Sequence, residues 1–256
     1  MDFNLNADIG EGYGDWVMGD DQALLDIIDS ANIACGFHAG DYAIMAQTMK
    51  AAASTKTSIG AHPGFYDLHG FGRRRHSLPL AEIEYLIAYQ LGAALGCAAL
   101  LGVKVTHIKP HGALNNMACA DPELSTAVAR AITSVDKKQI LLAPVLSALA
   151  TAGHEAGLTV AEEIFADRGY ADDGQLLPRG TKGAVITDST LASTRAVAMF
   201  TKGEIVTQTG KRLAITPHSI CVHGDGTTAL TMAKQVKQAL VTAGLTPKPL
   251  ANMRLG

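Results

Sequence analysis

The stretch "FNLNAD" (residues 3–8) alternates between apolar and polar residues with a period of two. In an extended strand this period separates the two faces, so Asn4, Asn6 and Asp8 share one face and apolar residues occupy the other. A strand buried between two layers of helices is apolar on both faces. The alternation therefore favours a barrel with a polar interior over an open, doubly wound sheet.

Four later stretches repeat the pattern: "NIACGFH" (32–38), "SIGAH" (58–62), "VTHIKPH" (105–111) and "SICVHGD" (219–225). Each has one apolar face and one small or polar face that becomes ionisable at the C-terminal end. Seven strands are expected, at 3–8, 31–37, 58–62, 104–109, 139–144, 159–165 and 219–223. Helices are expected at 20–28, 41–53, 79–101, 121–134, 145–156, 188–200 and 227–243.

Regular alternation of strands and helices indicates parallel strands covered by helices. We predict a single domain over residues 1–256: a seven-stranded, TIM-like (β/α) barrel with an inserted hairpin near residues 203–215. Active sites of such barrels lie at the C-terminal ends of the strands. This is where the ionisable residues of the repeated pattern would gather.

Composition narrows the class of protein. Of the residues, 48% are hydrophobic, and the net charge of −3 gives no basic footprint for nucleic acid. The four cysteines show no CxxC spacing, and the N-terminus lacks a basic segment followed by an apolar one, so we expect a cytoplasmic protein. The uncharged stretch 85–103 is weakly hydrophobic, and we interpret it as a buried helix in which Gly92 and Gly96 allow close backbone approach, not as a membrane span.

The strand ends supply the candidate chemistry. Asp8 and Glu11 could act as base and acid or bind a metal, although a loop cap and a solvated carboxylate are the simpler alternatives. His62 and His111 suit metal ligation or proton transfer near neutral pH. His38 and His223 end strands in the same way, and each could instead be a buried, hydrogen-bonded histidine.

Charged residues near these ends point to anionic partners. Lys109 would be costly in a lumen without a carboxylate or an anionic substrate beside it. Asp167 and Arg168 close another strand. Arg73, Arg74 and Arg75 in "GFGRRRH" could bind a carboxylate in a bidentate manner or form a solvated basic loop, and Arg73 or Arg74 is expected to bind the substrate. The sequence has no Walker A loop and no GxSxG elbow, so acid–base or metal-assisted hydrolysis is favoured over serine or cysteine catalysis.

Several motifs together resemble the LamB/YcsF family: "LNADIGEGYG", "NIACGFHAGD", "IGAHPGF" with "GFGRR", "IKPHGAL", "EIFADRGYADDGQLLPRG" and "CVHGD", spanning residues 4–225. The resemblance implies the A subunit of an ATP-dependent 5-oxoprolinase, which opens 5-oxo-L-proline to L-glutamate together with subunits B and C. It also implies a barrel related to those of glycoside hydrolases and deacetylases. The chain departs from the expected pattern at Asn115, where an aromatic is usual, and after Asp225, where a proline is usual.

We assign the site residues on this basis. The expected catalytic residues are Asp8, Glu11, Lys109, His111 and Asp167. The expected substrate-binding residues are Asn6, His38, Arg73, Arg74, Arg168 and His223. A divalent metal in the barrel mouth would take Asp8, His62 and His111, and ATP with Mg²⁺ would be used through the complex. The alternatives are a metal-dependent carbohydrate deacetylase and a non-catalytic substrate-binding subunit.

Overall fold

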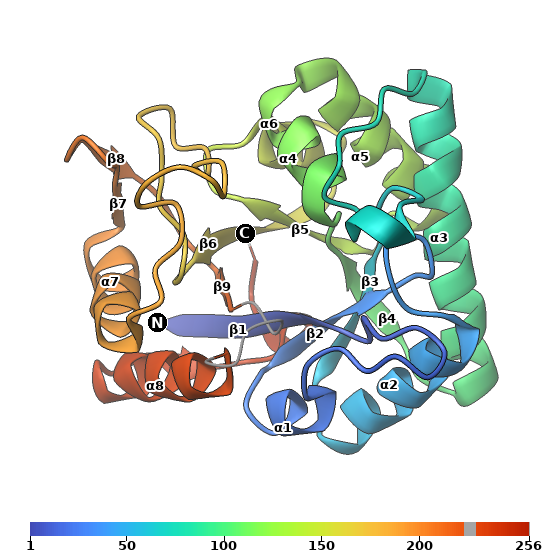
Figure 1. Cartoon of the computed structure of the whole chain (residues 1–256), viewed down its shortest axis with the longest axis horizontal. Helices are drawn as coiled ribbons and strands as arrows, with labels where there is room; N and C mark the ends of the chain where they lie inside the picture. Colours follow the sequence, from blue (N-terminus) through green and yellow to red (C-terminus); the bar gives the residue numbers. More distant parts are fainter. Residues whose placement is uncertain (223–228, 256) are drawn as a thin grey trace.

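Seven parallel strands close into a barrel in the computed structural model, which describes residues 1–222 and 229–255. The hydrogen-bonded order is β1-β2-β3-β4-β5-β6-β9, and β9 pairs back with β1 to complete the ring (Figure 1). The strands are β1 (Asp2–Ile9), β2 (Ser30–Ala34), β3 (Ser58–His62), β4 (Val105–Ile108), β5 (Ile140–Pro144), β6 (Thr159–Phe165) and β9 (Ser219–Cys221). The predicted TIM-like barrel is confirmed.

Helices surround the barrel (Figure 1). They are α1 (Asp21–Leu25), α2 (Tyr42–Ser54), α3 (Leu80–Leu101), α4 (Gly112–Ala120), α5 (Pro122–Asp136), α6 (Ala148–Glu155), α7 (Ser189–Lys202) and α8 (Ala229–Thr242), with short 3-10 turns at Leu68–Gly70 (η1) and Leu250–Asn252 (η2). The side chains of Asp41 and Asp121 accept backbone hydrogen bonds at the starts of α2 and α5, as helix caps do. Helix α4 was not predicted.

Three short strands lie outside the ring of seven. β7 (Glu204–Val206) and β8 (Arg212–Ala214) form an antiparallel hairpin between α7 and β9. β10 (Thr246–Pro247) extends the sheet beside the start of β1. The interpretation of the whole chain as a single domain stays a prediction.

Helix α3 differs from its sequence interpretation. It is long and apolar enough to cross a membrane by length and composition, yet 39% of its most apolar window is buried against the rest of the fold. Ile83, Ile87 and Leu91 face the core. Gly92 and Gly96 lie on the opposite face, where an added Cβ would meet nothing within 4 Å, so the expected close backbone approach at these glycines is wrong within this chain.

The barrel interior is polar, as the alternation predicts. Asn4, Asn6 and Asn32 are fully buried in the lumen, whereas the apolar residues of the same strands lie in the hydrophobic core. His107 fills the lumen opposite Gly60, where a Cβ would come within 2.2 Å of the imidazole Nε2. The lumen therefore holds a column of polar side chains that ends at the C-terminal rim.

Candidate active site

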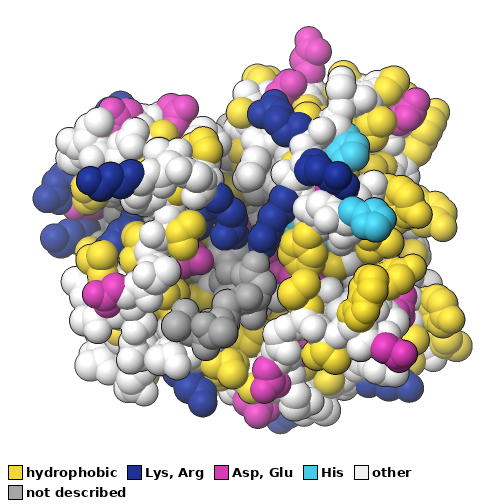
Figure 2. All heavy atoms as spheres, viewed as in Figure 1, with side chains coloured by type: hydrophobic (Ala, Val, Ile, Leu, Met, Phe, Trp, Pro, Cys, Tyr) yellow, Lys and Arg dark blue, Asp and Glu magenta, His cyan; other side chains and the backbone are white. Residues whose placement is uncertain are grey.

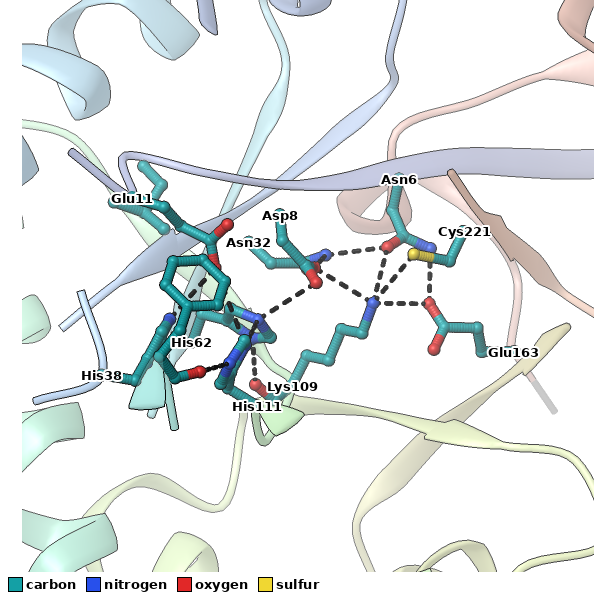
Figure 3. A network of polar contacts seen from close by, with 12 residues as sticks. Asn6, Asp8, Glu11, Asn32, His38, His62, Lys109, His111, Glu163 and Cys221 are labelled. Carbon is teal, nitrogen blue, oxygen red and sulfur yellow. Dashed lines mark hydrogen bonds and ion pairs between the residues drawn. The ribbon is translucent and has the colours of Figure 1, made fainter. Parts of the chain in front are cut away.

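A cavity of about 590 Å³ opens at the C-terminal ends of the strands. Seven of the predicted site residues line it, and five of these are the carboxylates, histidines and lysine Asp8, Glu11, His62, Lys109 and His111. They come from β1, β3, β4 and the loops that follow, so residues distant in sequence meet at one mouth, as Figure 3 shows. A barrel produces this convergence because all its parallel strands end on the same side.

Lys109 lies at the inner end of the cavity, where two carboxylates hold it. Its Nζ lies 3.1 Å from Asp8 Oδ1 and 3.0 Å from Glu163 Oε1, and it also contacts Asn6 Oδ1 and Cys221 Sγ at 3.2 Å (Figure 3). Burial acts to lower the pKa of Lys109, but these carboxylates outweigh it and hold that pKa well above its ordinary value. Lys109 is therefore a fixed cation, paired with carboxylates as expected for a lysine in a lumen.

Backbone carbonyls fix the tautomers of two histidines. His62 Nδ1 lies 2.6 Å from the Lys109 carbonyl oxygen, and His111 Nε2 lies 2.8 Å from the Phe71 carbonyl oxygen. A carbonyl only accepts, so both of these ring nitrogens donate. In the neutral rings, His62 Nε2 and His111 Nδ1 then carry lone pairs, and these two atoms face each other at 3.0 Å.

Protonation of His111 does not relieve this contact. Burial, together with the neighbouring His62, lowers the pKa of His111 to about 3. Burial also holds the pKa of His38 well below its ordinary value, with His111 and His62 adding to the effect. His111 and His38 are thus neutral at physiological pH, which is the form that ligates metals.

Four side chains gather their ligand atoms at this point. The ligand atoms of Glu11, His38, His62 and His111 all lie within 4.8 Å of one another. Glu11 Oε1 is 3.1 Å from His38 Nε2 and 3.6 Å from His111 Nδ1, and the His38 and His111 rings stack at 3.7 Å. Convergent ligand atoms, with the second ring nitrogens of His62 and His111 tied to carbonyls, match a divalent metal and its supporting shell.

The structure groups the predicted metal ligands somewhat differently. Asp8 Oδ2 lies 3.3 Å from His62 Nε2, so Asp8 borders the four-residue cluster, while its Oδ1 is engaged by Lys109 and Asn32. Glu11 and His38, which were assigned other roles, join His62 and His111 instead. We call Asp8, Glu11, His38, His62 and His111 the mouth cluster.

Arginines line the outer part of the cavity. Arg73, Arg75 and Arg179 contribute to its wall, and Figure 2 shows Lys and Arg side chains gathered near the centre of this face. Arg74 does not reach it, because its guanidinium pairs with Asp67. The Asp67–Arg74 hydrogen bond lowers the pKa of Asp67 to about 2, and Arg74 therefore ties down its own loop.

Arg168 lines the cavity, but its guanidinium is engaged in hydrogen bonds to backbone carbonyls. Its Nε donates to the Ala184 carbonyl and its Nη2 to the Leu177 carbonyl, at 3.0 and 2.6 Å. These bonds fasten the long loop between β6 and α7, which also carries Arg179. We read Arg168 as holding this loop in place.

Two further predicted residues lie outside the cavity lining. Asn6 is buried in the lumen and does not line the cavity; its amide donates to Glu163 and Ser219. Asp167 is buried at the end of β6 and is absent from the cavity lining. His223 lies outside the described residues.

Sequence reasoning missed two contributors. Glu163 is fully buried in the lumen, on the strand face that it shares with Ala161 and Phe165. The period of two narrows the choice to Glu162 or Glu163, which point to opposite faces of β6, and does not decide between them. Arg179 had no such signal, because it lies in an irregular loop whose position depends on contacts such as those of Arg168.

Comparisons with known proteins agree with the fold and the motifs. The profile of the LamB/YcsF family matches residues 3–255. A Rhodopseudomonas palustris protein named as the A subunit of 5-oxoprolinase is 50% identical over 252 residues, covering 98% of this chain and 99% of that one. The crystal structure of a lactam utilization protein from Thermus thermophilus superposes with a TM-score of 0.92 at 36% identity, covering 98% of this chain and 100% of that one. A deacetylase solved with substrate shares the fold alone, with a TM-score of 0.51 at 14% identity over 97% of this chain and 88% of that one.

Proposed function

The chain belongs to the LamB/YcsF family, and from that premise we propose that it is the A subunit of an ATP-dependent 5-oxoprolinase and that its barrel mouth opens the lactam ring. The observation that carries the proposal is one cavity that joins a fixed cation, Lys109, to the carboxylates and histidines of the mouth cluster under a wall of arginines. The names of its relatives support a lactam substrate.

The chemistry of the substrate explains why ATP is needed. A lactam carbonyl is a poor electrophile, and transfer of the ATP γ-phosphoryl group to its oxygen makes the ring carbon reactive. Water then adds to that carbon and loses a proton to a base, and the C–N bond breaks as the ring nitrogen takes up a proton. A second water hydrolyses the resulting acyl phosphate, leaving glutamate and phosphate.

We assign the base to Asp8. Lys109 and Asn32 hold its Oδ1, which leaves Oδ2 turned toward the histidines and reachable from the cavity. The low pKa of His111 makes that imidazole a weak base, so His111 does not take the proton of the water. Its Nδ1 orients the water, directly or through a metal that Nδ1 would hold. Lys109 keeps its charge and stabilises the negative oxygens that develop as water adds.

The arginines suit the anionic groups of the substrate. Arg73 and Arg75 at the wall can bind the α-carboxylate or the transferred phosphoryl group, because guanidinium groups bind such oxygens in pairs. A metal held by Glu11, His38, His62 and His111 would supply Lewis-acid polarisation of water or of the lactam oxygen.

ATP with Mg²⁺ acts, in this proposal, through subunits B and C. The chain has no Walker A sequence of its own. A relative is named as an A subunit, and an A subunit belongs to an enzyme with further subunits. We assign phosphoryl transfer from ATP to those further subunits. The cytoplasmic location predicted from the sequence suits a complex that depends on ATP.

Purified subunits test the proposal directly. Glutamate formation from 5-oxo-L-proline is measured with the chain alone, with B and C alone, and with all three plus ATP and Mg²⁺. We expect turnover only in the complete mixture. Efficient turnover without this chain, or by this chain alone, contradicts the proposal.

A metal-dependent carbohydrate deacetylase is the second candidate, and the four-residue metal cluster favours it. Hydrolysis of an acetamide needs no ATP when a metal activates the water. Release of acetate from N-acetylated sugars by the metal-loaded chain, with no glutamate from the complete mixture, would select this function. If the complete mixture forms glutamate at the wild-type rate with the Asp8→Asn chain, the non-catalytic role in substrate binding is selected.

A further inference from the structure

Helix α3 presents an apolar face to the outside of the molecule. Tyr85, Tyr89 and Leu100 are 71%, 68% and 85% exposed. Hydrophobic side chains gather in Figure 2 along the side where Figure 1 places α3. Large apolar side chains clustered on one exposed face mark an interaction surface more often than isolated ones do. We call the surface formed by residues 82, 85, 89, 92, 93, 96 and 100 the α3 face.

The centre of this face is open to another backbone. Gly92 and Gly96 stand one helical turn apart there, and a Cβ added at either would meet no atom within 4 Å. A second helix can therefore cross α3 at close range, with Tyr89 and Leu100 packing on either side of the crossing.

The charges at the two ends of the face are opposite. No Asp, Glu, Lys or Arg occurs between residues 85 and 103. Exposed Glu82 lies in the first turn of α3, and exposed Lys104 follows its C-terminus. The neighbouring Glu84 is engaged by Arg130 of α5, so Glu82 is the acidic group left at that end of the face.

These charges are complementary to those of the same face on a second copy that runs antiparallel to the first. The midpoint between residues 82 and 104 is Ala93, beside Gly92. In an antiparallel pair of α3 helices related by a two-fold axis at that midpoint, Glu82 of each copy meets Lys104 of the other, and the glycines lie at the crossing. A two-fold interface requires this self-complementarity.

We propose that the α3 face is the interface of a homodimer in which two copies of this chain pack antiparallel about Ala93.

Neighbouring aromatics widen the interface. Tyr89 stacks on Phe37 with ring centroids 5.4 Å apart, and Tyr66, also 71% exposed, packs edge-on against the same ring at 5.4 Å. One 22-residue helix is only about 33 Å long, and a stable interface buries roughly 800 Å² per partner. Phe37 and Tyr66 supply apolar area beyond the helix itself.

A lipid surface fits the face less well. Interfacial helices carry several basic residues beside their apolar face. The α3 face has one acidic and one basic end, which is the pattern for pairing with a copy of itself and not for anionic headgroups.

Charge exchange tests the pairing in the purified chain by sedimentation equilibrium. We expect the wild type to dimerise at micromolar concentration. Glu82→Lys and Lys104→Glu each place like charges at both symmetric contacts, so each should weaken dimerisation about tenfold or more. The double exchange, Glu82→Lys with Lys104→Glu, should restore it. Lys234→Glu on α8 is the matched control and should change nothing.

A cross-link tests the geometry. Ala93→Cys in a Cys97→Ser background places one thiol near the axis on each copy, and mild oxidation should give a disulfide-linked dimer. The same cysteine introduced at exposed Leu191 of α7 should not cross-link. Leu100→Glu should yield a monomer with an unchanged circular dichroism spectrum.

Four results would overturn the proposal. The wild type could be monomeric at tens of micromolar, or its dimer could be indifferent to the Glu82 and Lys104 exchanges. Alternatively, Leu100→Glu could leave the chain's own association unchanged while weakening assembly with subunits B and C, which would assign the face to them. Binding of the wild type to anionic vesicles that is lost in Leu100→Glu, without dimerisation, would assign it to a membrane.

Discussion

The floor of the lumen and its mouth are both polar and buried, but their hydrogen bonds differ. At the floor, Asn4 donates to Ser30 Oγ and to the Lys248 carbonyl at 2.8 Å, and it accepts from Ser219 Oγ at 2.8 Å. Donors there meet acceptors. At the mouth, His62 Nε2 and His111 Nδ1 face each other at 3.0 Å, and the carbonyl partners of the two rings make both of these nitrogens acceptors when the rings are neutral.

Within this one column of side chains, the difference assigns a structural role to the floor and a functional role to the mouth. A buried polar group with its partners in place stabilises the fold, whereas converging acceptors need a cation or a reacting group between them. Substitutions at the floor should therefore change stability and leave activity intact. Substitutions at the mouth should do the reverse.

The largest effect is expected for Asp8→Asn. It nearly preserves shape but removes the base, and loss of a general base typically slows a reaction by ~10²–10⁴-fold. The initial rate of glutamate formation in the complete complex measures this. Asn4→Ala at the floor is the control and should keep the rate per folded molecule. Equal loss in both variants would erase the distinction between floor and mouth.

Metal binding should follow the mouth cluster. Zn²⁺ at a hundredfold excess over its Kd should stabilise the chain by about 2.7 kcal/mol, seen as a rise in Tm. His62→Ala should lose this rise, and His69→Ala, at an exposed histidine, should keep it. An identical Zn²⁺-induced rise in His62→Ala would mean that the metal binds elsewhere.

At the floor the expected effect is on stability. Asn4→Ala leaves buried Ser30 and Ser219 without one partner each, and an unsatisfied buried polar group costs about 1–3 kcal/mol. Urea unfolding followed by circular dichroism measures the change. An unchanged midpoint would show that water or a rearrangement replaces the lost bonds.

Adjacent arginines offer a smaller, matched comparison. Arg73 lines the cavity and Arg74 pairs with Asp67 instead. Arg73→Lys keeps the charge but loses two-pronged binding, so the KM for 5-oxo-L-proline should rise several-fold. Arg74→Lys should leave KM unchanged. The reverse pattern would place Arg74 at the substrate.

A further effect is expected in the pH dependence of stability. Burial lowers the pKa of His107 to about 3, whereas an unfolded histidine titrates near ~6.5. Between these values the unfolded chain binds the extra proton, so stability should fall as the pH drops below about 6.5 and should not change from this cause above it. Urea unfolding at pH 5 and 7 should show a smaller difference for His107→Gln than for the wild type. An equal difference would remove His107 as a source of the acid sensitivity.

Much of the barrel could be predicted because the controlling signals are local. The period of two in residues 3–8 placed Asn4, Asn6 and Asp8 in the lumen, and Asp41 and Asp121 marked two helix starts. Strand ends then located the mouth. These features depend on residues within a few positions of one another.

What could not be predicted depends on distant contacts. Nothing in "GFGRRRH" distinguishes Arg73 from Arg74. The two differ only in the folded loop, where Arg74 forms an ion pair with Asp67 and Arg73 lines the cavity. The alanines and glycines of α3 are similar on all sides, so the sequence did not reveal that Gly92 and Gly96 face outward. Helix α4 could not be predicted because it follows His111 directly and begins with glycine, a poor helix former.

The central claim is that this chain opens the ring and that activation by ATP precedes it in partner subunits. A single-turnover measurement of ADP and glutamate in the complex carrying Asp8→Asn tests it most directly. We predict that ADP forms at about the wild-type rate while glutamate formation is slowed by orders of magnitude. Glutamate at the wild-type rate, or loss of ADP formation together with glutamate, would contradict it.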